Sequence, residues 1–319
     1  SNPSSKGNLS GLFASASLEV SRKKIKENLN IKNKKIVFTS GATESNNLAL
    51  FGFARNFQRR TGRYGNIITL TTEHKAVLEP LRQLKKEGFS ITELNPESDG
   101  LILEKNLLNA LRDDTFLISI MLANNEIGVI QPVEKIFKIC QKNNIKFHTD
   151  AAQCPGYLPI NNFDSLANMI TLSSHKIYGP KGIGLLIIDE DIQLNPILYG
   201  GGQEFGYRSG TLPLPLIVGF SKAIELAIKN QERNSIQLAK RRDTLMNGLL
   251  KKNSKILING SMIDRLPHNL NLTLLDINGS KFHKYIKHQI ACSSGSACSN
   301  GEVSHVLTSI GRSFKEAES

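Results

Sequence analysis

Short apolar runs alternate with helical stretches over the first two thirds of the chain, and this alternation limits the possible folds more than any other feature. Strands are expected at residues 35–39, 67–71, 91–94, 116–122, 146–149, 168–173 and 183–188. Helices are expected at residues 16–29, 48–57, 75–86, 103–111 and 133–141. Strands that alternate with helices across short loops form a mostly parallel sheet with helices on both faces. The sequence therefore predicts an α/β fold.

The pattern changes after a glycine-rich loop at residues 199–211, which is either a connector or a second phosphate contact. Long helices are expected at residues 213–230 and 235–250. Short strands at 255–258 and 269–275 and a helix at 281–287 follow them. With 319 residues the chain is long enough for one large or two ordinary domains. We predict a large domain over residues 1–212 and a small α+β domain over residues 213–319.

The composition is that of a globular protein, with 39% hydrophobic and 21% charged residues. No apolar run reaches the length of a membrane span, and residues 1–20 lack the features of a signal peptide. We therefore expect a soluble, cytoplasmic protein. Its four cysteines form no CxxC pair and no zinc spacing, so neither a disulfide scaffold nor a structural metal is indicated.

The net charge of +12 raises the possibility of a basic nucleic-acid-binding or scaffold protein without chemistry. The basic residues are spread over helical faces, the chain has no Trp, and no known nucleic-acid-binding module is recognisable. Attraction to an acidic partner explains the charge better, although charge alone does not decide the function.

Polar residues follow the expected strands at the points where the strands end. They are His74, Asn125, Asp150, Gln153 and Lys176. In parallel sheets, ligands bind outside the carboxyl ends of the strands. Any one of these residues has an alternative explanation as a structurally satisfied polar group, but five at one edge indicate a binding site.

Lys176 lies between two apolar runs, in the segment SSHKIYGPKG at residues 173–182. Burial at the end of a strand lowers the pKa of an amine, and a neutral amine condenses with an aldehyde to give a Schiff base. Pyridoxal 5'-phosphate (PLP) is held by enzymes in this way. An ordinary surface lysine beside a tight turn is the alternative for this segment alone.

Residues 40–47, with the sequence SGATESNN, join an expected strand to an expected helix. Such a turn directs free backbone N–H groups and the helix dipole at one point, and Thr43 adds a hydroxyl. A phosphate would fit there, although an ordinary helix N-cap would leave the same pattern.

Cys298 lies among small residues in the segment ACSSGSACSNG at residues 291–301. This composition is typical of an exposed, mobile loop, and mobility suits a thiol that moves between a substrate and an acceptor. An incidental cysteine in a surface loop is the alternative.

Taken together, the motifs resemble those of the cysteine desulfurases, PLP enzymes of the class V aminotransferase group with the fold of aspartate aminotransferase (fold type I). The matching segments occur in the family's order and are FTSGATESNNLA, TTEHKAVL, SIMLANNEIGV, HTDAAQ, SSHKIYGPKGIG, YRSGTLP and SSGSACSNGEVSHVL. The cysteine in SSGSAC separates desulfurases from aminotransferases of the same fold. The resemblance implies that the chain converts L-cysteine to L-alanine and leaves a persulfide on Cys298, for delivery to an iron–sulfur scaffold or another acceptor.

The resemblance also implies a role for each matching residue. Lys176 would form the Schiff base with PLP and remove the substrate's α-proton, and Asp150 would pair with the pyridinium nitrogen. His74 would stack on the ring and move protons. Gln153 would bind the phenolic oxygen of the ring, and Asn125 would lie near cofactor and substrate.

The phosphate group of PLP would be bound by several small and polar residues. They are Ala42, Thr43, Ser173 and His175. Thr211 would reach the phosphate of a partner subunit, which makes a homodimer part of the active site. The expected catalytic residues are thus Lys176, Cys298 and His74, with PLP as the cofactor and no metal.

Two departures from the family pattern are visible. The family's initial LDYxATTP-like strand and its later RFS-type strand, whose Arg binds the substrate carboxylate, have no counterpart here. We therefore expect the sequence to be incomplete at both ends. A selenocysteine lyase or another class V PLP aminotransferase is the alternative enzyme.

Overall fold

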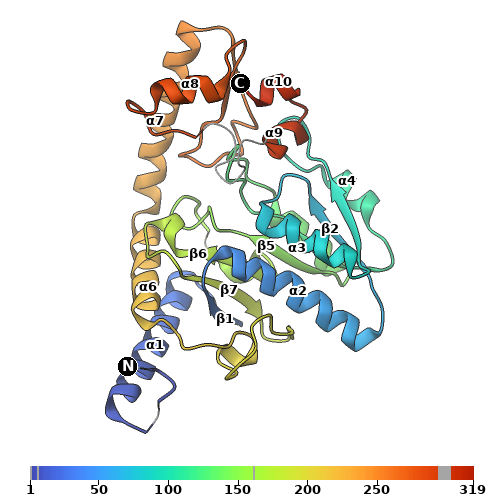
Figure 1. Ribbon diagram of the computed structural model, residues 1–319, viewed down its shortest axis with the longest axis vertical. Coiled ribbons are helices and arrows are strands. Elements are labelled where there is room, and N and C mark those ends of the chain that lie inside the picture. The colour runs from blue at the N-terminus through green and yellow to red at the C-terminus, as the bar shows by residue number, and fades with distance from the viewer. Residues whose placement is uncertain (1, 6, 161, 294–302) are drawn as a thin grey trace.

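The computed structural model describes residues 2–5, 7–160, 162–293 and 303–319, and its centre is a seven-stranded sheet (Figure 1). The strands are β1 (Lys34–Thr39), β2 (Asn66–Leu70), β3 (Ser90–Leu94), β4 (Thr115–Ser119), β5 (Lys146–Asp150), β6 (Met169–Ser173) and β7 (Gly184–Asp189). Their order across the sheet is β1-β7-β6-β5-β4-β2-β3. Only β7 runs against its neighbours, since it pairs antiparallel with both β1 and β6. The expected α/β fold with a mostly parallel sheet is confirmed.

Both faces of the sheet are buried, because alternate residues of each strand enter different apolar clusters. In β1, β2 and β4 the residues Val37, Ile67 and Leu117 lie in one cluster, and the next residue of each strand lies in the other. Successive side chains of a strand point to opposite faces, so the sheet separates two cores. This explains why its strands are nearly continuous apolar runs.

Helices cover each face of the sheet. Those that follow the first strands are α2 (Ala42–Thr61), α3 (Lys75–Lys86), α4 (Glu104–Ala110) and α5 (Val133–Lys142). Residues of α2 and α3 bury Leu48, Val77 and Leu81 in one core. The opposite core receives apolar residues from α1 (Leu9–Asn28), α5 and α6 (Leu214–Lys229).

After α6 the chain runs away from the sheet as α7 (Gln231–Lys252), a long helix with no buried residue (Figure 1). It leads to a small two-stranded sheet of β8 (Ile256–Ile258) and β9 (Leu272–Leu274). The helices α8 (Gly279–Ile286), α9 (His305–Ser309) and α10 (Phe314–Ala317) belong to the same region. The division of the chain at residue 212 stays a prediction.

Most expected elements are present, but several boundaries were wrong. Helix α1 begins at Leu9 rather than at residue 16, because the Asn8 side chain accepts a hydrogen bond from the Gly11 N–H and caps the helix. Strand β4 ends at Ser119 rather than at residue 122. The short helices α9 and α10 were not expected, because they lack the length that makes a helical period visible.

A buried ladder of polar side chains crosses the centre of the sheet. The His148 ring on β5 lies between the Ser119 hydroxyl of β4, at 2.8 Å from Nδ1, and the Thr171 hydroxyl of β6, at 3.1 Å from Nε2. Burial lowers the pKa of His148 from 6.5 to about 3, so the ring is neutral near pH 7. The ladder joins three strands immediately before Asp150.

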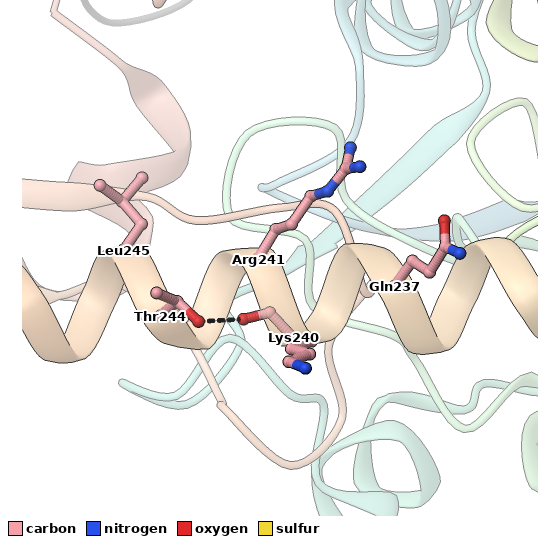
Figure 2. A pocket seen from close by; sticks show the side chains of 5 residues that line it. All are labelled: Gln237, Lys240, Arg241, Thr244 and Leu245. Carbon is pink, nitrogen blue, oxygen red and sulfur yellow. Dashed lines mark hydrogen bonds between the residues drawn. The ribbon is translucent and has the colours of Figure 1, made fainter.

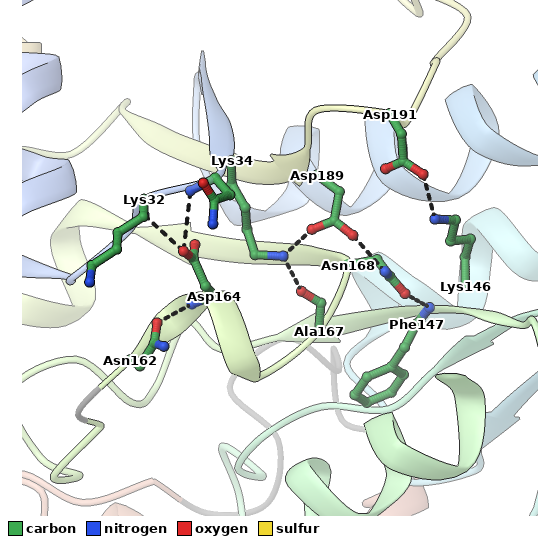
Figure 3. A network of polar contacts seen from close by, with 11 residues as sticks. Lys32, Lys34, Lys146, Phe147, Asn162, Asp164, Ala167, Asn168, Asp189 and Asp191 are labelled. Atoms are coloured by element: carbon green, nitrogen blue, oxygen red, sulfur yellow. Dashed lines mark hydrogen bonds and ion pairs between the residues drawn. The ribbon is translucent and has the colours of Figure 1, made fainter. Parts of the chain in front are cut away.

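A second polar network lies at the edge of the sheet where β7 ends and where β1, β5 and β6 begin (Figure 3). The Asp189 carboxylate at the end of β7 accepts hydrogen bonds from Lys34 Nζ of β1 and, at 2.6 Å, from Asn168 Nδ2. Asn168 Oδ1 accepts from the Phe147 N–H of β5 at 2.8 Å. These contacts tie the first strand of the sheet to strands that follow much later in the chain.

Within the described ranges, no helix is long and apolar enough to cross a membrane. In the same ranges, no group of three or more His, Cys, Asp or Glu side chains is placed to hold a metal ion. Cys140 and Cys154 are buried free thiols, and Cys292 is an exposed one.

Candidate active site

Lys176 lies in a 3-10 turn, η2 (Ser174–Ile177), directly after β6. The turn ends at Tyr178, which adopts a left-handed conformation with φ of 62°, and the Gly179 N–H closes it on the Ser174 carbonyl at 3.0 Å. The Lys176 side chain is exposed. The expectation that this side chain is buried at the end of the strand is therefore wrong for the chain without a ligand. Its position at the carboxyl end of β6 agrees with the sequence.

Asp150 ends β5 and is 8% exposed. Its Oδ2 accepts a hydrogen bond from Asn46 Nδ2 at 2.7 Å, and its Oδ1 accepts one from the Ala152 N–H at 2.9 Å. Each carboxylate oxygen is thus held by one donor, which fixes the plane of the group. Asn46 was missed in the sequence analysis, although its place near the start of α2, in the SGATESNN segment, was a signal.

His74 caps the N-terminus of α3, and its Nδ1 accepts a hydrogen bond from the Ala76 N–H at 3.0 Å. Burial lowers the pKa of His74; the Asp150 charge opposes this shift and the Lys176 charge adds to it. The ring is therefore neutral near pH 7, with its proton on Nε2 because Nδ1 is an acceptor. His74, Asp150 and Lys176 lie at or just after the carboxyl ends of β2, β5 and β6, so they lie along the same edge of the sheet.

The N-terminus of α2 opens toward the same edge of the sheet. Gly41 is the N-cap, and no side chain caps the helix. The first N–H groups of a helix have no partner within it, so they remain available to an anion together with the positive end of the dipole. Ala42 is half-buried and Thr43 is exposed in this first turn. The Ser173 hydroxyl lies 3.0 Å from His175 Nδ1 at the end of β6.

Glycine is required beside this helix start. A Cβ at Gly184 of β7 would lie 2.6 Å from the Gly41 Cα, whereas a Cβ at Gly41 would meet nothing within 4 Å. The strand backbone therefore packs closely under the turn, and the space on the other side of Gly41 is open. Gly184 is a second residue that the sequence analysis missed.

An ion pair fixes the glycine-rich loop to the same helix start. Arg208 Nε donates to Glu44 Oε1 at 2.8 Å, and Arg208 Nη2 donates to Glu44 Oε2 at 3.3 Å. Burial raises the pKa of Glu44, but hydrogen bonds from Arg208 and the Ser40 N–H outweigh it, and the pKa is lowered. Thr211, three residues after Arg208, is exposed.

Glu73, next to His74, is a buried acid that the sequence analysis did not identify. It is 0% exposed; its Oε1 accepts from the Met121 N–H at 2.7 Å, and its Oε2 is buried without a hydrogen-bond partner. Burial raises the pKa of Glu73 well above 4.5; the Met121 N–H lowers it and the Asp150 charge raises it further. Burial therefore favours the neutral, protonated form of this side chain.

The other site residues expected from the sequence differ in their exposure. Asn125 is exposed, whereas the neighbouring Asn124 is buried. The Asn124 Oδ1 accepts hydrogen bonds from the N–H groups of Glu126 and Ile127. Gln153 is half-buried. Cys298 lies outside the described residues.

The chemistry of these donors fits PLP. A buried carboxylate with a fixed plane suits a pyridinium nitrogen, and an uncapped helix N-terminus with open space at Gly41 suits a phosphate. Asn46 Oδ1, buried without a partner next to Asp150, is a further polar atom available to a ligand.

Two hollows of the surface lie away from the expected site residues. One of about 540 Å³ follows α7 and is lined by Gln237, Lys240, Arg241, Thr244 and Leu245 (Figure 2). Another of about 470 Å³ lies between α1 and α6. Neither is lined by an expected site residue.

Comparison with known proteins agrees with this geometry. The family model of class-V aminotransferases matches residues 1–314. The chain is 44% identical to the cysteine desulfurase IscS of Histophilus somni over 322 residues, which cover 100% of this chain and 78% of that protein. Among solved structures, a NifS-like protein matches with a TM-score of 0.91 and 34% identity over 100% of this chain and 84% of its own. SspA in complex with cysteine matches with a TM-score of 0.84 and 37% identity, over 99% and 88% of the two chains.

The chain belongs to the class-V aminotransferase family. Within that family, the relatives named here are cysteine desulfurases or NifS-like proteins, or were solved with cysteine bound.

Proposed function

We propose that the chain is a PLP-dependent cysteine desulfurase that takes sulfur from L-cysteine and releases L-alanine. The proposal is supported above all by the order of the sheet, in which Lys176, Asp150 and His74 lie at strand ends along the carboxyl edge, beside the uncapped start of α2. The 44% identity to a cysteine desulfurase and the likeness to a structure solved with cysteine support the choice of substrate.

PLP, when bound, supplies an aldehyde for an amine and a ring that accepts electron density from the substrate's α-carbon. Asp150 would pair with the ring nitrogen, and Lys176 would hold the cofactor through its Nζ. The N–H groups at the start of α2 and the side chains of Thr43, Ser173 and His175 would bind the phosphate. Gln153 and Asn125 would complete the cofactor site.

The protein's own groups then move the protons. The Lys176 amine, when it is free, removes the proton from the substrate's Cα. A general base must lie within hydrogen-bond reach of the proton that it removes. The neutral His74 ring accepts through Nδ1 from the Ala76 N–H, so Nε2 is the ring nitrogen that carries a proton and can donate. Its lowered pKa keeps it in this form near pH 7.

Sulfur transfer uses Cys298. Its thiolate attacks the sulfur of the substrate, an S–S bond forms, and the Cβ–S bond of the substrate breaks. The carbon skeleton takes up a proton and leaves as alanine, and Cys298 carries the persulfide. An iron–sulfur scaffold or another sulfur acceptor then receives the terminal sulfur. We place this reaction in the cytoplasm and in a homodimer, with Thr211 of each subunit at the phosphate of the other.

The decisive test is mass spectrometry of purified, PLP-loaded protein after brief exposure to L-cysteine without reductant, with alanine assayed in the same sample. We expect one additional sulfur on Cys298 and release of alanine. Both should be lost in Lys176→Ala, and the added sulfur should be lost in Cys298→Ser.

Other outcomes identify the alternatives. Full activity of Cys298→Ser on its best substrate would indicate a selenocysteine lyase or an aminotransferase. Protein that never acquires the yellow cofactor under any loading condition would contradict the proposal as a whole.

A further inference from the structure

The turn between β4 and α5, residues 124–130, contacts several residues that follow α7 in the chain. The Leu266 N–H donates to the Gly128 carbonyl at 2.8 Å, and Asn269 Nδ2 donates to the Glu126 carbonyl at 3.0 Å. Ile127 and Val129 of this turn are buried with Val306 and Leu307 of α9 in one apolar cluster. The turn is therefore a docking platform for α9.

Two polar contacts fix the start of α9 on this platform. Ser304 is 1% exposed, and its hydroxyl donates to Glu126 Oε2 at 2.5 Å while it accepts from the Leu307 N–H at 3.2 Å. The His305 ring places Nε2 3.0 Å from the carbonyl oxygen of Glu73, where it donates. The second contact reaches the residue that precedes His74. The start of α9 is thus joined to the edge of the sheet that holds the candidate site.

The position of these contacts in the chain gives them a consequence for the thiol. Five residues, 299–303, separate Cys298 from Ser304 in the sequence. An extended chain spans at most ~3.3–3.6 Å per residue, so fixing Ser304 keeps Cys298 within roughly 20–22 Å of it. If α9 left the turn at residues 124–130, Ser304 would no longer be fixed near the active-site edge. The limit on the distance between Ser304 and Cys298 would then no longer keep the thiol near that edge, and productive encounters of thiol and substrate would be rarer.

We propose that Ser304 and His305 are positioning residues for sulfur transfer, because they anchor the C-terminal side of the Cys298 segment to the Glu126 side chain and the Glu73 carbonyl. This role rests on the proposed desulfurase function. It does not require either residue to touch the cofactor or the substrate. Ser304 and His305 should therefore affect the sulfur-transfer step that uses Cys298, and they should not affect cofactor binding.

The test compares two substitutions of His305. His305→Phe keeps a ring of similar size and removes the donor, whereas His305→Gln supplies an N–H donor on a side chain of similar reach. A neutral hydrogen bond contributes enough to change a population about 3- to 10-fold. We expect His305→Phe to slow persulfide formation on Cys298 by about that factor, and His305→Gln to remain within about twofold of the parent protein. PLP content and the visible absorbance change on addition of L-cysteine should be unchanged in both.

A second readout does not depend on catalysis. Amide hydrogen exchange in the peptide 304–312 should be faster in His305→Phe and close to that of the parent in His305→Gln. His283→Phe is the matched control, because His283 Nε2 makes the same kind of contact with the Cys292 carbonyl, at 2.7 Å, away from the large sheet. It should leave exchange in α9 unchanged.

The proposal is overturned if His305→Phe matches the parent in both readouts, if His305→Gln is as slow as His305→Phe, or if His305→Phe loses PLP. If the parent protein forms no persulfide, the proposed function fails by itself, and the exchange measurement still decides whether His305 anchors α9.

Discussion

The Asp150 carboxylate shows how one residue is prepared for a ligand by its neighbours. Asn46 and the Ala152 N–H each hold one oxygen, so the group cannot rotate. The Asn46 donor belongs to α2, and the Ala152 donor follows β5. The orientation of Asp150 therefore depends on the packing of α2 against the sheet. Asn46 is therefore as much a part of the site as Asp150.

Asn46→Ala should weaken PLP binding about tenfold, because a hydrogen bond to a charged group is lost and Asp150 Oδ2 keeps no side-chain partner. The dissociation constant is measured by titrating PLP into the apoprotein and following absorbance. Asn47→Ala is the control, since the Asn47 side chain bonds only to the Thr43 carbonyl of its own helix. Equal affinity of Asn46→Ala and the parent protein would show that Asp150 needs no such support.

Glu73 gives a prediction about stability. Its pKa is raised, so the folded state keeps the acid neutral, and stability is lost as the pH rises above the ordinary value of 4.5. Glu73→Gln retains an acceptor for the Met121 N–H and has no charge to bury. It should be more stable than the parent at pH 8, by an amount that shrinks toward pH 5. Glu73→Ala should be destabilised by about 1–3 kcal/mol at pH 5, because the Met121 N–H loses its partner, and by less at pH 8, because alanine does not titrate.

Urea unfolding at pH 5 and pH 8 measures these differences. A Glu73→Gln protein that is less stable than the parent at pH 8 would indicate that the carboxylate is charged in the folded state.

At the scale of elements, the ladder of Ser119, His148 and Thr171 predicts a pH-dependent loss of stability. The pKa of His148 falls from 6.5 to about 3 on folding, so the unfolded chain binds the extra proton between these values. Stability is therefore complete above pH 6.5 and falls as the pH decreases toward 3, by up to about 1.4 kcal/mol per pH unit from this residue. His148→Gln, which does not titrate, should have a smaller slope of unfolding free energy between pH 4.5 and 6.5. An unchanged slope would assign the acid sensitivity to other groups.

The sequence predicted the elements of the large sheet well, because most of its strands are buried on both faces and rich in apolar or β-branched residues. It also placed Lys176, Asp150 and His74 at strand ends, where parallel topology brings them together. It did not reveal Asn46, Glu73 or His305, because their roles depend on partners distant in the chain. His305 and Glu73 are 232 residues apart, and no local pattern records such a contact.

At the scale of the whole molecule, the proposed homodimer with shared sites makes a prediction about mixed subunits. Lys176→Ala inactivates the subunit's own site, whereas Thr211→Asp, by placing a carboxylate at the phosphate, should inactivate the site of the other subunit. Each variant alone should be inactive, but a mixed dimer regains one intact site. With random exchange of equal amounts, half of the dimers are mixed, so activity should return to about a quarter of that of the parent.

Desulfurase activity of the two variants before and after joint refolding measures this recovery. No recovery, with mixed dimers demonstrated by mass, would show that Thr211 acts within its own subunit or in neither site.

The position of β7 in the sheet has a consequence for synthesis of the chain on the ribosome. β1 has β7 as its one neighbour in the sheet, and Lys34 meets Asp189 across 155 residues of sequence. At about 5–20 residues per second, the apolar strand β1 waits about 8–30 s after its own synthesis before its partner is made. During that time β1 has no partner strand, and β6 also presents an unpaired edge once it is made; such edges are surfaces on which nascent chains associate. A translation pause before residue 189 would therefore lengthen the exposure of both edges.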